Sequence, residues 1–141
     1  MSSRYDLNRF KERQDEFYLQ ALEEIKEGEK QSHWIWYIFP QLKGLGSSIN
    51  SEYYGIEDID EATDYLNVDL LRRNLEGIST ALLNINGKTA KEIFGPIDCK
   101  KVHSSMTLFA QVPGASPVYN KVLEKYYHAI PDQKTIDLLN K

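Results

Sequence analysis

The fold is decided by residues 71–85, LRRNLEGISTALLNI, in which apolar side chains recur at alternating steps of four and three residues. Because an α-helix completes a turn every 3.6 residues, this spacing places the apolar side chains on one face. The stretch therefore predicts a helix with a buried apolar stripe. The stripe consists of Leu71, Leu75, Ile78, Leu82 and Ile85.

Turn and capping residues continue the helical pattern toward the C-terminus. Asn86-Gly87 has the chemistry of a turn, and Thr89 is placed to cap a short helix over residues 90–94. Gly95-Pro96 then breaks the chain again. Asp98 follows, and we expect it to cap a helix over residues 98–112.

Two more helices are expected after residue 112. Pro117 suits the first turn of one helix, which ends before Pro131. A shorter helix follows that proline. Its apolar residues are Ile136, Leu138 and Leu139.

Helical spacing also precedes residue 71. A short helix is expected from Asp60 through Leu66, and a longer one between Asp6 and Gly28. Asp6 is the expected N-cap of the longer helix, and Gly28 is its expected stop. The apolar residues of the longer helix are Leu7, Phe10, Phe17, Ala21 and Ile25, with Tyr18 and Leu22 beside them.

Residues 32–41, SHWIWYIFPQ, are the densest aromatic stretch of the chain. The residue before a proline is biased away from the helical region, so we expect a short buried helix that ends near Phe39. The glycine-rich residues 44–48 are then expected to form a loop that continues to Gly55. Taken together, the patterns predict an all-α fold with about six to eight helices in one compact domain over residues 1–141.

Composition and charge exclude several classes of protein. The chain has 17 basic and 21 acidic residues and a net charge of −4, which argues against broad binding to nucleic acid. It has no apolar run long enough to cross a membrane and no apolar stretch of signal-peptide length near the N-terminus. A single cysteine, Cys99, rules out an intramolecular disulfide. We therefore expect a cytoplasmic protein that does not bind membranes.

The expected helix over residues 98–112 sorts its side chains onto two faces. Ser105 falls on the apolar face, where a serine is either bonded back to its own helix or pointed at a buried polar partner. The sequence leaves both alternatives open. One stripe holds Lys100, His103, Ser104, Thr107 and Gln111, and the opposite face holds Cys99, Val102, Met106 and Phe109.

The first turn of the same helix carries Lys100 and Lys101, where the helix dipole disfavours cations. Such a placement suggests a nearby anion, although lysines are more often simply solvated. A bound anion would receive hydrogen bonds from Lys101, from the first-turn amides and from the hydroxyl groups. Phosphate has the matching chemistry.

The aromatic stretch offers a flat wall and one titratable group. On a helix, His33 shares a face with Trp36 and Tyr37, where it could donate a proton or orient a ligand, or serve only in packing. Trp34 and Trp36 cannot both face the core easily on so short a helix, so at least one is a candidate for stacking on a flat ligand.

Several sharper motifs are absent from the sequence. Residues 44–48 lack the Gly-Lys-Ser/Thr ending of a phosphate-binding P-loop. Cys99 and His103 have a usable metal spacing, but no second Cys/His pair completes a zinc site. There is no Gly-x-Ser-x-Gly elbow of a serine hydrolase. We therefore expect no metal and no cofactor.

A set of residues and strings spread along the chain is specific when taken together: Arg9-Phe10, Tyr18, Ala21-Leu22, Gly28, residues 32–41, Gly44-Leu45-Gly46, Ala62, Tyr65-Leu66 and residues 98–109. On these residues, the chain resembles the bacterial family known as domain of unknown function 1810, some members of which carry the label calpastatin. The resemblance implies a single, mostly helical domain and supplies no established activity. It is strongest from Arg9 to Phe109 and continues to Leu139.

We arrive at three hypotheses for function. In the first, the aromatic segment 32–41 and the helix 98–112 wall a pocket for a small polar ligand, phosphorylated or nucleotide-derived. Hydrolysis of that ligand would use His33 or Asp98 as acid or base. The expected ligand contacts are Trp34, Trp36, Tyr37, Gln41, Lys101, His103, Ser104, Ser105 and Thr107.

The second hypothesis is an interaction module, in which the aromatic segment is an exposed patch for a protein partner. The third is a helical core with no small-molecule site. A cleft walled by both segments would favour the pocket, a flat aromatic patch would favour the interaction module, and full burial would favour the core.

Overall fold

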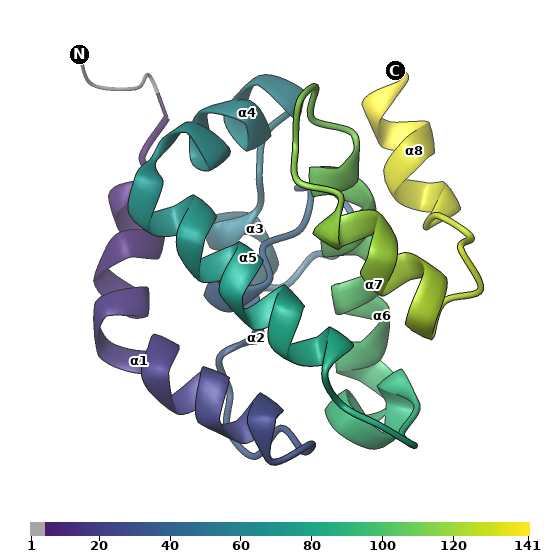
Figure 1. The fold of residues 1–141 in the computed structure, drawn as a ribbon. Coiled ribbons are helices and arrows are strands. Elements are labelled where there is room, and N and C mark those ends of the chain that lie inside the picture. The colour runs from purple at the N-terminus through teal and green to yellow at the C-terminus, as the bar shows by residue number, and fades with distance from the viewer. Residues whose placement is uncertain (1–4) are drawn as a thin grey trace.

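The structure is a computed structural model that describes residues 5–141, and within this range the chain forms helices and no strand. The expected all-α fold in one compact domain is confirmed (Figure 1). The eight helices of the described residues are α1 (Asn8–Lys26), α2 (Ile35–Ile38), α3 (Ile49–Tyr54), α4 (Ile59–Asn67), α5 (Asp69–Leu83), α6 (Ala90–Ala110), α7 (Val118–Tyr126) and α8 (Gln133–Leu139).

Helix α5 lies between α1 and α7 and packs against both (Figure 1). Four of its five predicted stripe residues, Leu71, Leu75, Ile78 and Leu82, are buried, and Ile85 is half-buried just beyond the end of the helix. Burial of such side chains contributes about 1.5–3 kcal/mol each, so this stripe is a major source of stability. The stretch that predicts the fold therefore forms its centre.

Helix α6 is bent at the predicted break. Gly95 has a φ of +87°, which side-chain-bearing residues rarely adopt, and Pro96 follows it. The expected cap at the start of α6 is confirmed as a capping box. The Thr89 hydroxyl accepts from the Glu92 N–H at 3.1 Å, and the Glu92 carboxylate accepts from the Thr89 N–H at 2.8 Å.

The two aspartate caps expected from the sequence are wrong. Leu7 precedes α1 without a side-chain cap, and the carbonyl of Asp6 accepts from the side chain of Arg9. Asp98 lies inside α6, the third residue after the bend at Gly95, and its carboxylate bonds to lysine side chains. The carboxylate of an aspartate near a helix start can bind either free backbone amides or nearby cations, and the carboxylate of Asp98 binds two lysines.

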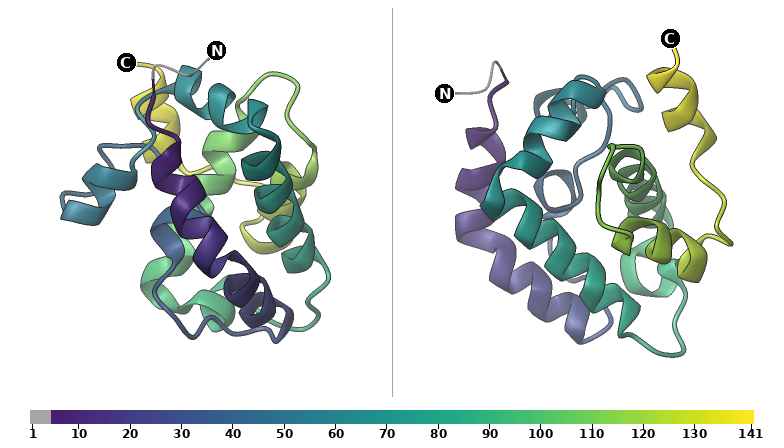
Figure 2. Two further views of the ribbon diagram at one scale, coloured as in Figure 1. Left: turned by 90° about the vertical axis from the view of Figure 1, so that its left-hand side faces the viewer. Right: turned by 45° about the horizontal axis from the view of Figure 1, so that its top comes forward.

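The expected loop over residues 44–55 is also wrong in part, because residues 49–54 form α3. The Ser48 hydroxyl caps it by accepting from the Ser51 N–H at 3.1 Å. Its first residue, Ile49, is 88% exposed, and α3 stands out from the body in the left view of Figure 2. The helix therefore has no buried apolar stripe by which periodicity could reveal it.

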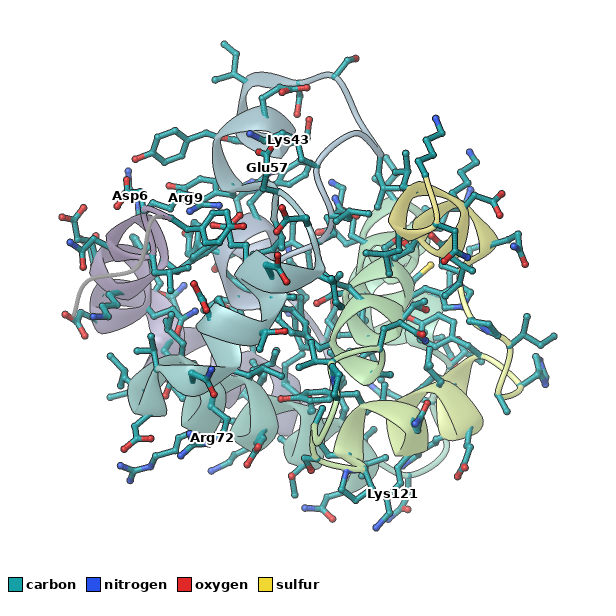
Figure 3. The ribbon with its side chains drawn as sticks, turned by 90° about the horizontal axis from the view of Figure 1, so that it is seen from above. Asp6, Arg9, Lys43, Glu57, Arg72 and Lys121 are labelled. Atoms are coloured by element: carbon teal, nitrogen blue, oxygen red, sulfur yellow. The ribbon has the colours of Figure 1, made fainter. Side chains whose placement is uncertain are left out.

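A buried guanidinium ties the end of α3 to α1 and α4. Arg9 donates to the carbonyl oxygens of Tyr53 and Gly55, each at 2.9 Å, and pairs with the Glu61 carboxylate at 2.9 Å. Figure 3 shows Arg9 beside Asp6 at the start of α1, with Lys43 and Glu57 close together nearby. Several bonds on one rigid guanidinium compensate for its burial.

The C-terminal helices follow the sequence prediction. Pro117 precedes α7, and α8 contains the expected apolar residues Ile136, Leu138 and Leu139. The right view of Figure 2 shows α8 at the edge of the molecule, and it packs against α6. Among residues 5–141, no helix has both the length and the apolar character needed to span a membrane.

Candidate functional site

A cavity of about 490 Å³ lies where α2, the loop after it, the middle of α6 and the start of α8 meet. The ammonium of Lys101 lies 4.1 Å from the centroid of the Trp36 ring, so the expected meeting of the two segments is confirmed. The cavity is lined by Trp36, Gln41, Leu45, Gly46, Ile97, Lys100, Lys101, His103, Ser104, Asp132, Gln133 and Lys134.

Lys101 is held in place by a carboxylate that it shares with a second lysine. Its Nζ lies 3.1 Å from one oxygen of Asp98, and the Nζ of Lys30 lies 2.8 Å from the other. Burial raises the pKa of Asp98, but the two lysines outweigh it, so that the pKa is lowered overall. Asp98 is therefore ionised at neutral pH, and the three groups together keep one positive charge.

His103 lines the cavity and is fixed by contacts with the segment after α7. Its ring stacks on Tyr127 with centroids 4.3 Å apart and planes inclined by 2°, and its Nε2 lies 2.7 Å from the carbonyl oxygen of Ile130. The Tyr127 hydroxyl donates to the carbonyl of Cys99 at 2.6 Å, and burial raises the pKa of Tyr127. These contacts hold His103 in one orientation.

Hydroxyl groups of α6 anchor the start of α8. The Ser104 hydroxyl lies within donating distance of the carbonyl of Lys100, at 3.1 Å, and of the Asp132 carboxylate, at 3.2 Å. The fully buried Thr107 donates to the carbonyl of His103 at 2.8 Å and accepts from the Asp132 N–H at 2.9 Å. Ser104 thus lines the cavity, whereas Thr107 supports its wall from behind.

Five of the sequence-predicted residues line one cavity, and the others lie outside it. Trp34 is fully buried, and its Nε1 donates to Glu24 at 3.0 Å, so the two tryptophans divide between core and cavity. Tyr37 packs on other aromatic rings, and His33 is exposed away from the cavity lining. The five lining residues are Trp36, Gln41, Lys101, His103 and Ser104.

Ser105 fits neither of the two alternatives that the sequence left open. Its hydroxyl is fully buried and has no hydrogen-bond partner among residues 5–141. An unpaired buried hydroxyl costs free energy. Ser105 does not line the cavity.

The sequence reasoning missed the contribution of α8 and the charge balance of the lining. Asp132 and Lys134 come from the start of α8, and Lys100 and Lys101 come from α6. The lining therefore holds three lysines against one carboxylate, in a chain with net charge −4. The placement of Asp132 after a proline and three residues before Thr135 is the one local signal that could have identified it as a cap.

In the part of the chain that the structure describes, no three His, Cys, Asp or Glu side chains are grouped closely enough to hold a metal ion. The arrangement can instead attract an anion through its lysines, stack a flat group on Trp36, and exchange hydrogen bonds through Gln41, Ser104 and Asp132.

These features define the class: a single-domain, all-helical protein with a cationic pocket against one indole wall. Within that class, the chain belongs to the family described as protein of unknown function (DUF1810), whose model matches residues 4–139. It is similar to the crystal structure of the conserved hypothetical protein Rv1873 from Mycobacterium tuberculosis, with 41% sequence identity and a TM-score of 0.96. The match covers 99% of each chain. A comparison with curated proteins found no match.

Proposed function

We propose that the cavity between α2 and α6 binds a small anionic ligand that carries a flat ring, a nucleotide-derived or otherwise phosphorylated compound. The observation that carries the proposal is the Lys101 ammonium over the Trp36 ring, in a lining that holds two further lysines. Lysines supply charge-assisted hydrogen bonds to an anion, and an indole supplies a stacking surface. The volume of about 490 Å³ lies within the range typical of small-molecule sites.

Hydrolysis of the ligand has less support than binding. His33 is exposed and does not line the cavity, and Asp98 is held as a carboxylate between two lysines. A general acid must carry a proton within hydrogen-bond reach of the leaving group. Neither of the two expected catalytic residues meets that requirement.

The interaction module is the less favoured alternative. Of the aromatic residues in segment 32–41, Trp34 and Phe39 are buried, and Trp36 and Tyr37 are half-buried. An interaction patch needs contiguous exposed apolar surface with aromatic anchors. The segment offers instead one indole face at the edge of a cavity, which suits a small molecule better than a protein.

Two substitutions test the proposal by calorimetric titration with a nucleoside monophosphate, AMP, as the probe. Lys101→Ala removes a charge-assisted hydrogen bond and should weaken binding by about 1.5–3 kcal/mol. Added salt should weaken AMP binding by the wild type more than AMP binding by this variant. The reason is that salt screens the Lys101 charge, which only the wild type keeps. Trp36→Ala should weaken binding by about 1–3 kcal/mol, with little dependence on salt.

Lys121→Ala is the matched control, since Lys121 is an exposed lysine of α7 that does not line the cavity (Figure 3). Its affinity for AMP should equal that of the wild type. Capture of metabolites on immobilised protein, read by mass spectrometry, extends the search beyond AMP. Equal affinity of the wild type, Lys101→Ala and Trp36→Ala for a captured phosphorylated compound would overturn the proposed site.

A further inference from the structure

One aspartate, Asp132, lines the cavity together with three lysines. Asp132 caps α8, and a single one of its oxygens, Oδ2, accepts all of its hydrogen bonds. The donors are the Thr135 N–H at 3.1 Å, the Thr135 hydroxyl at 2.6 Å and the Ser104 hydroxyl at 3.2 Å. Among residues 5–141, no donor is bonded to the second oxygen, Oδ1.

The position of this carboxylate is rigidly determined. The Asp132 N–H donates to the hydroxyl of Thr107, which is fully buried on α6, so backbone and side chain are both anchored to the wall of the cavity. A group held in this way keeps its orientation when a ligand arrives. Asp132 lines the cavity, so Oδ1 is the oxygen of this carboxylate that is left for a hydrogen bond from a ligand.

The lysines of the lining do not neutralise Asp132. No ion pair joins it to Lys100, Lys101 or Lys134 within the described range, while Lys101 is paired with Asp98. A bare phosphate would gain from the lysines but would be repelled by the carboxylate. The arrangement suits a ligand that is anionic at one end and presents hydrogen-bond donors at another.

We propose that Asp132 accepts hydrogen bonds from hydroxyl groups of the ligand, so that the ligand class is a phosphorylated sugar, with a nucleoside monophosphate as the form that also uses Trp36. This inference rests on the proposed function and narrows it. Hydroxyl groups bonded to a carboxylate form short, strong hydrogen bonds, and acidic residues bind ribose hydroxyls in other nucleotide sites. The phosphate lies toward the lysines, the sugar hydroxyls lie on Asp132, and the flat ring lies on Trp36.

The test compares four probes on the intact wild-type chain by calorimetric titration: AMP, 2′,3′-dideoxy-AMP, ribose 5-phosphate and inorganic phosphate. Loss of the hydroxyl bonds to a charged acceptor should make dideoxy-AMP bind about tenfold to a hundredfold more weakly than AMP. Ribose 5-phosphate should bind more tightly than inorganic phosphate, because it keeps the hydroxyl groups. Equal affinity for AMP and dideoxy-AMP would overturn this inference and leave the proposed function standing.

A substitution of Asp132 provides the second part of the test. Asp132→Asn keeps a good helix cap but loses the charge, and should reduce the preference for AMP over dideoxy-AMP to about threefold or less. Asp15→Asn, at an exposed position of α1, should keep the wild-type preference. A full wild-type preference in a folded Asp132→Asn variant would refute the role of Asp132. Binding of none of the four probes would overturn both this inference and the AMP form of the proposed function.

Discussion

The indole of Trp34 donates a hydrogen bond of 3.0 Å to the carboxylate of Glu24, which joins the start of α2 to the last turns of α1. The same carboxylate accepts from the backbone N–H groups of Gln31 and Ser32, from the Ser32 hydroxyl and from the Gln20 amide. One buried carboxylate therefore organises the connection that places the aromatic segment. Through that connection it also sets the position of the pocket wall.

Glu24→Gln should destabilise the protein more at pH 7 than at low pH. Burial raises the pKa of Glu24, but the hydrogen bonds of Gln31, Ser32, Trp34 and Gln20 outweigh it and lower the pKa to about 2. A pKa below the unfolded value means that the carboxylate stabilises the fold above about pH 4.5, and that this contribution is lost as the pH falls toward 2. A pKa shift of this size corresponds to a stabilising contribution of about 3 kcal/mol. Urea unfolding of the wild type and of Glu24→Gln at pH 7 and at pH 2 measures this contribution. A stability difference that does not shrink at low pH would contradict the lowered pKa of Glu24.

Asp98→Asn should cost about 2–4 kcal/mol of stability, because it leaves the ammonium of Lys30 buried without its partner. The Lys30 side chain is only 8% exposed. In the background of Lys30→Met the same substitution should cost much less stability, since no buried ammonium then loses its carboxylate partner. Denaturant unfolding of the two single variants and the double variant completes the cycle. An equal cost in both backgrounds would instead mean that Asp98 acts through its own helix.

Arg9→Lys should loosen α3 without unfolding the rest of the chain. A lysine cannot reproduce the hydrogen bonds that the guanidinium makes to Tyr53 and Gly55 while it also pairs with Glu61. We expect a loss of about 2–4 kcal/mol in global stability and faster amide exchange over residues 51–56. Hydrogen exchange read by mass spectrometry resolves the two effects. Unchanged exchange in this segment, with α5 as the internal reference, would show that Arg9 does not hold α3.

The effect of Gly77→Ala on the stability of the protein should change sign with the residue at position 18. A Cβ at Gly77 would lie 2.8 Å from the hydroxyl oxygen of Tyr18, which donates to the carbonyl of Asn74 at 2.8 Å. In the wild type this crowding should cost about 1–3 kcal/mol. In a Tyr18→Phe background the oxygen is absent, and the higher helix propensity of alanine should stabilise α5 by up to about 1 kcal/mol. Thermal unfolding of the four proteins measures both signs, and destabilisation of equal size in both backgrounds would exclude the Tyr18 contact as the cause.

The parts of the fold that the sequence predicts well are those determined by local chemistry. The apolar period of α5, the capping box at Thr89, the bend at Gly95 and the end of α1 near Gly28 depend on neighbours within a few residues. The predictions that are wrong concern residues whose structure depends on contacts with distant parts of the chain. Asp98 lies beside Lys30, which is remote in sequence, and α3 is held by Arg9 and by the one buried ring of Tyr54 rather than by a periodic apolar face.

The same division applies to the candidate site. Trp36, Gln41 and Lys101 come from segments whose density of aromatic or polar residues is visible in the sequence. The sequence could not show which tryptophan is buried and which lines the cavity, because this depends on the hydrogen bond that Trp34 donates to Glu24. Asp132 was missed because its place at the cavity depends on the packing of α8 against α6.

The bend at Gly95 has a consequence for the way this protein tolerates insertions. From Pro96 to Ala110 the helix is continuous, so the cavity-lining Lys101 keeps a constant angular offset from the buried Val102 and Met106. One residue inserted between Lys101 and Val102 would rotate the lysine by about 100° relative to the core anchors that follow. An insertion next to Gly95, where the backbone already leaves the helical path, would let each half keep its own phase. The bend thus makes the register of residues 90–94 independent of the register of residues 96–110, which carry both the cavity-lining lysines and the core anchors.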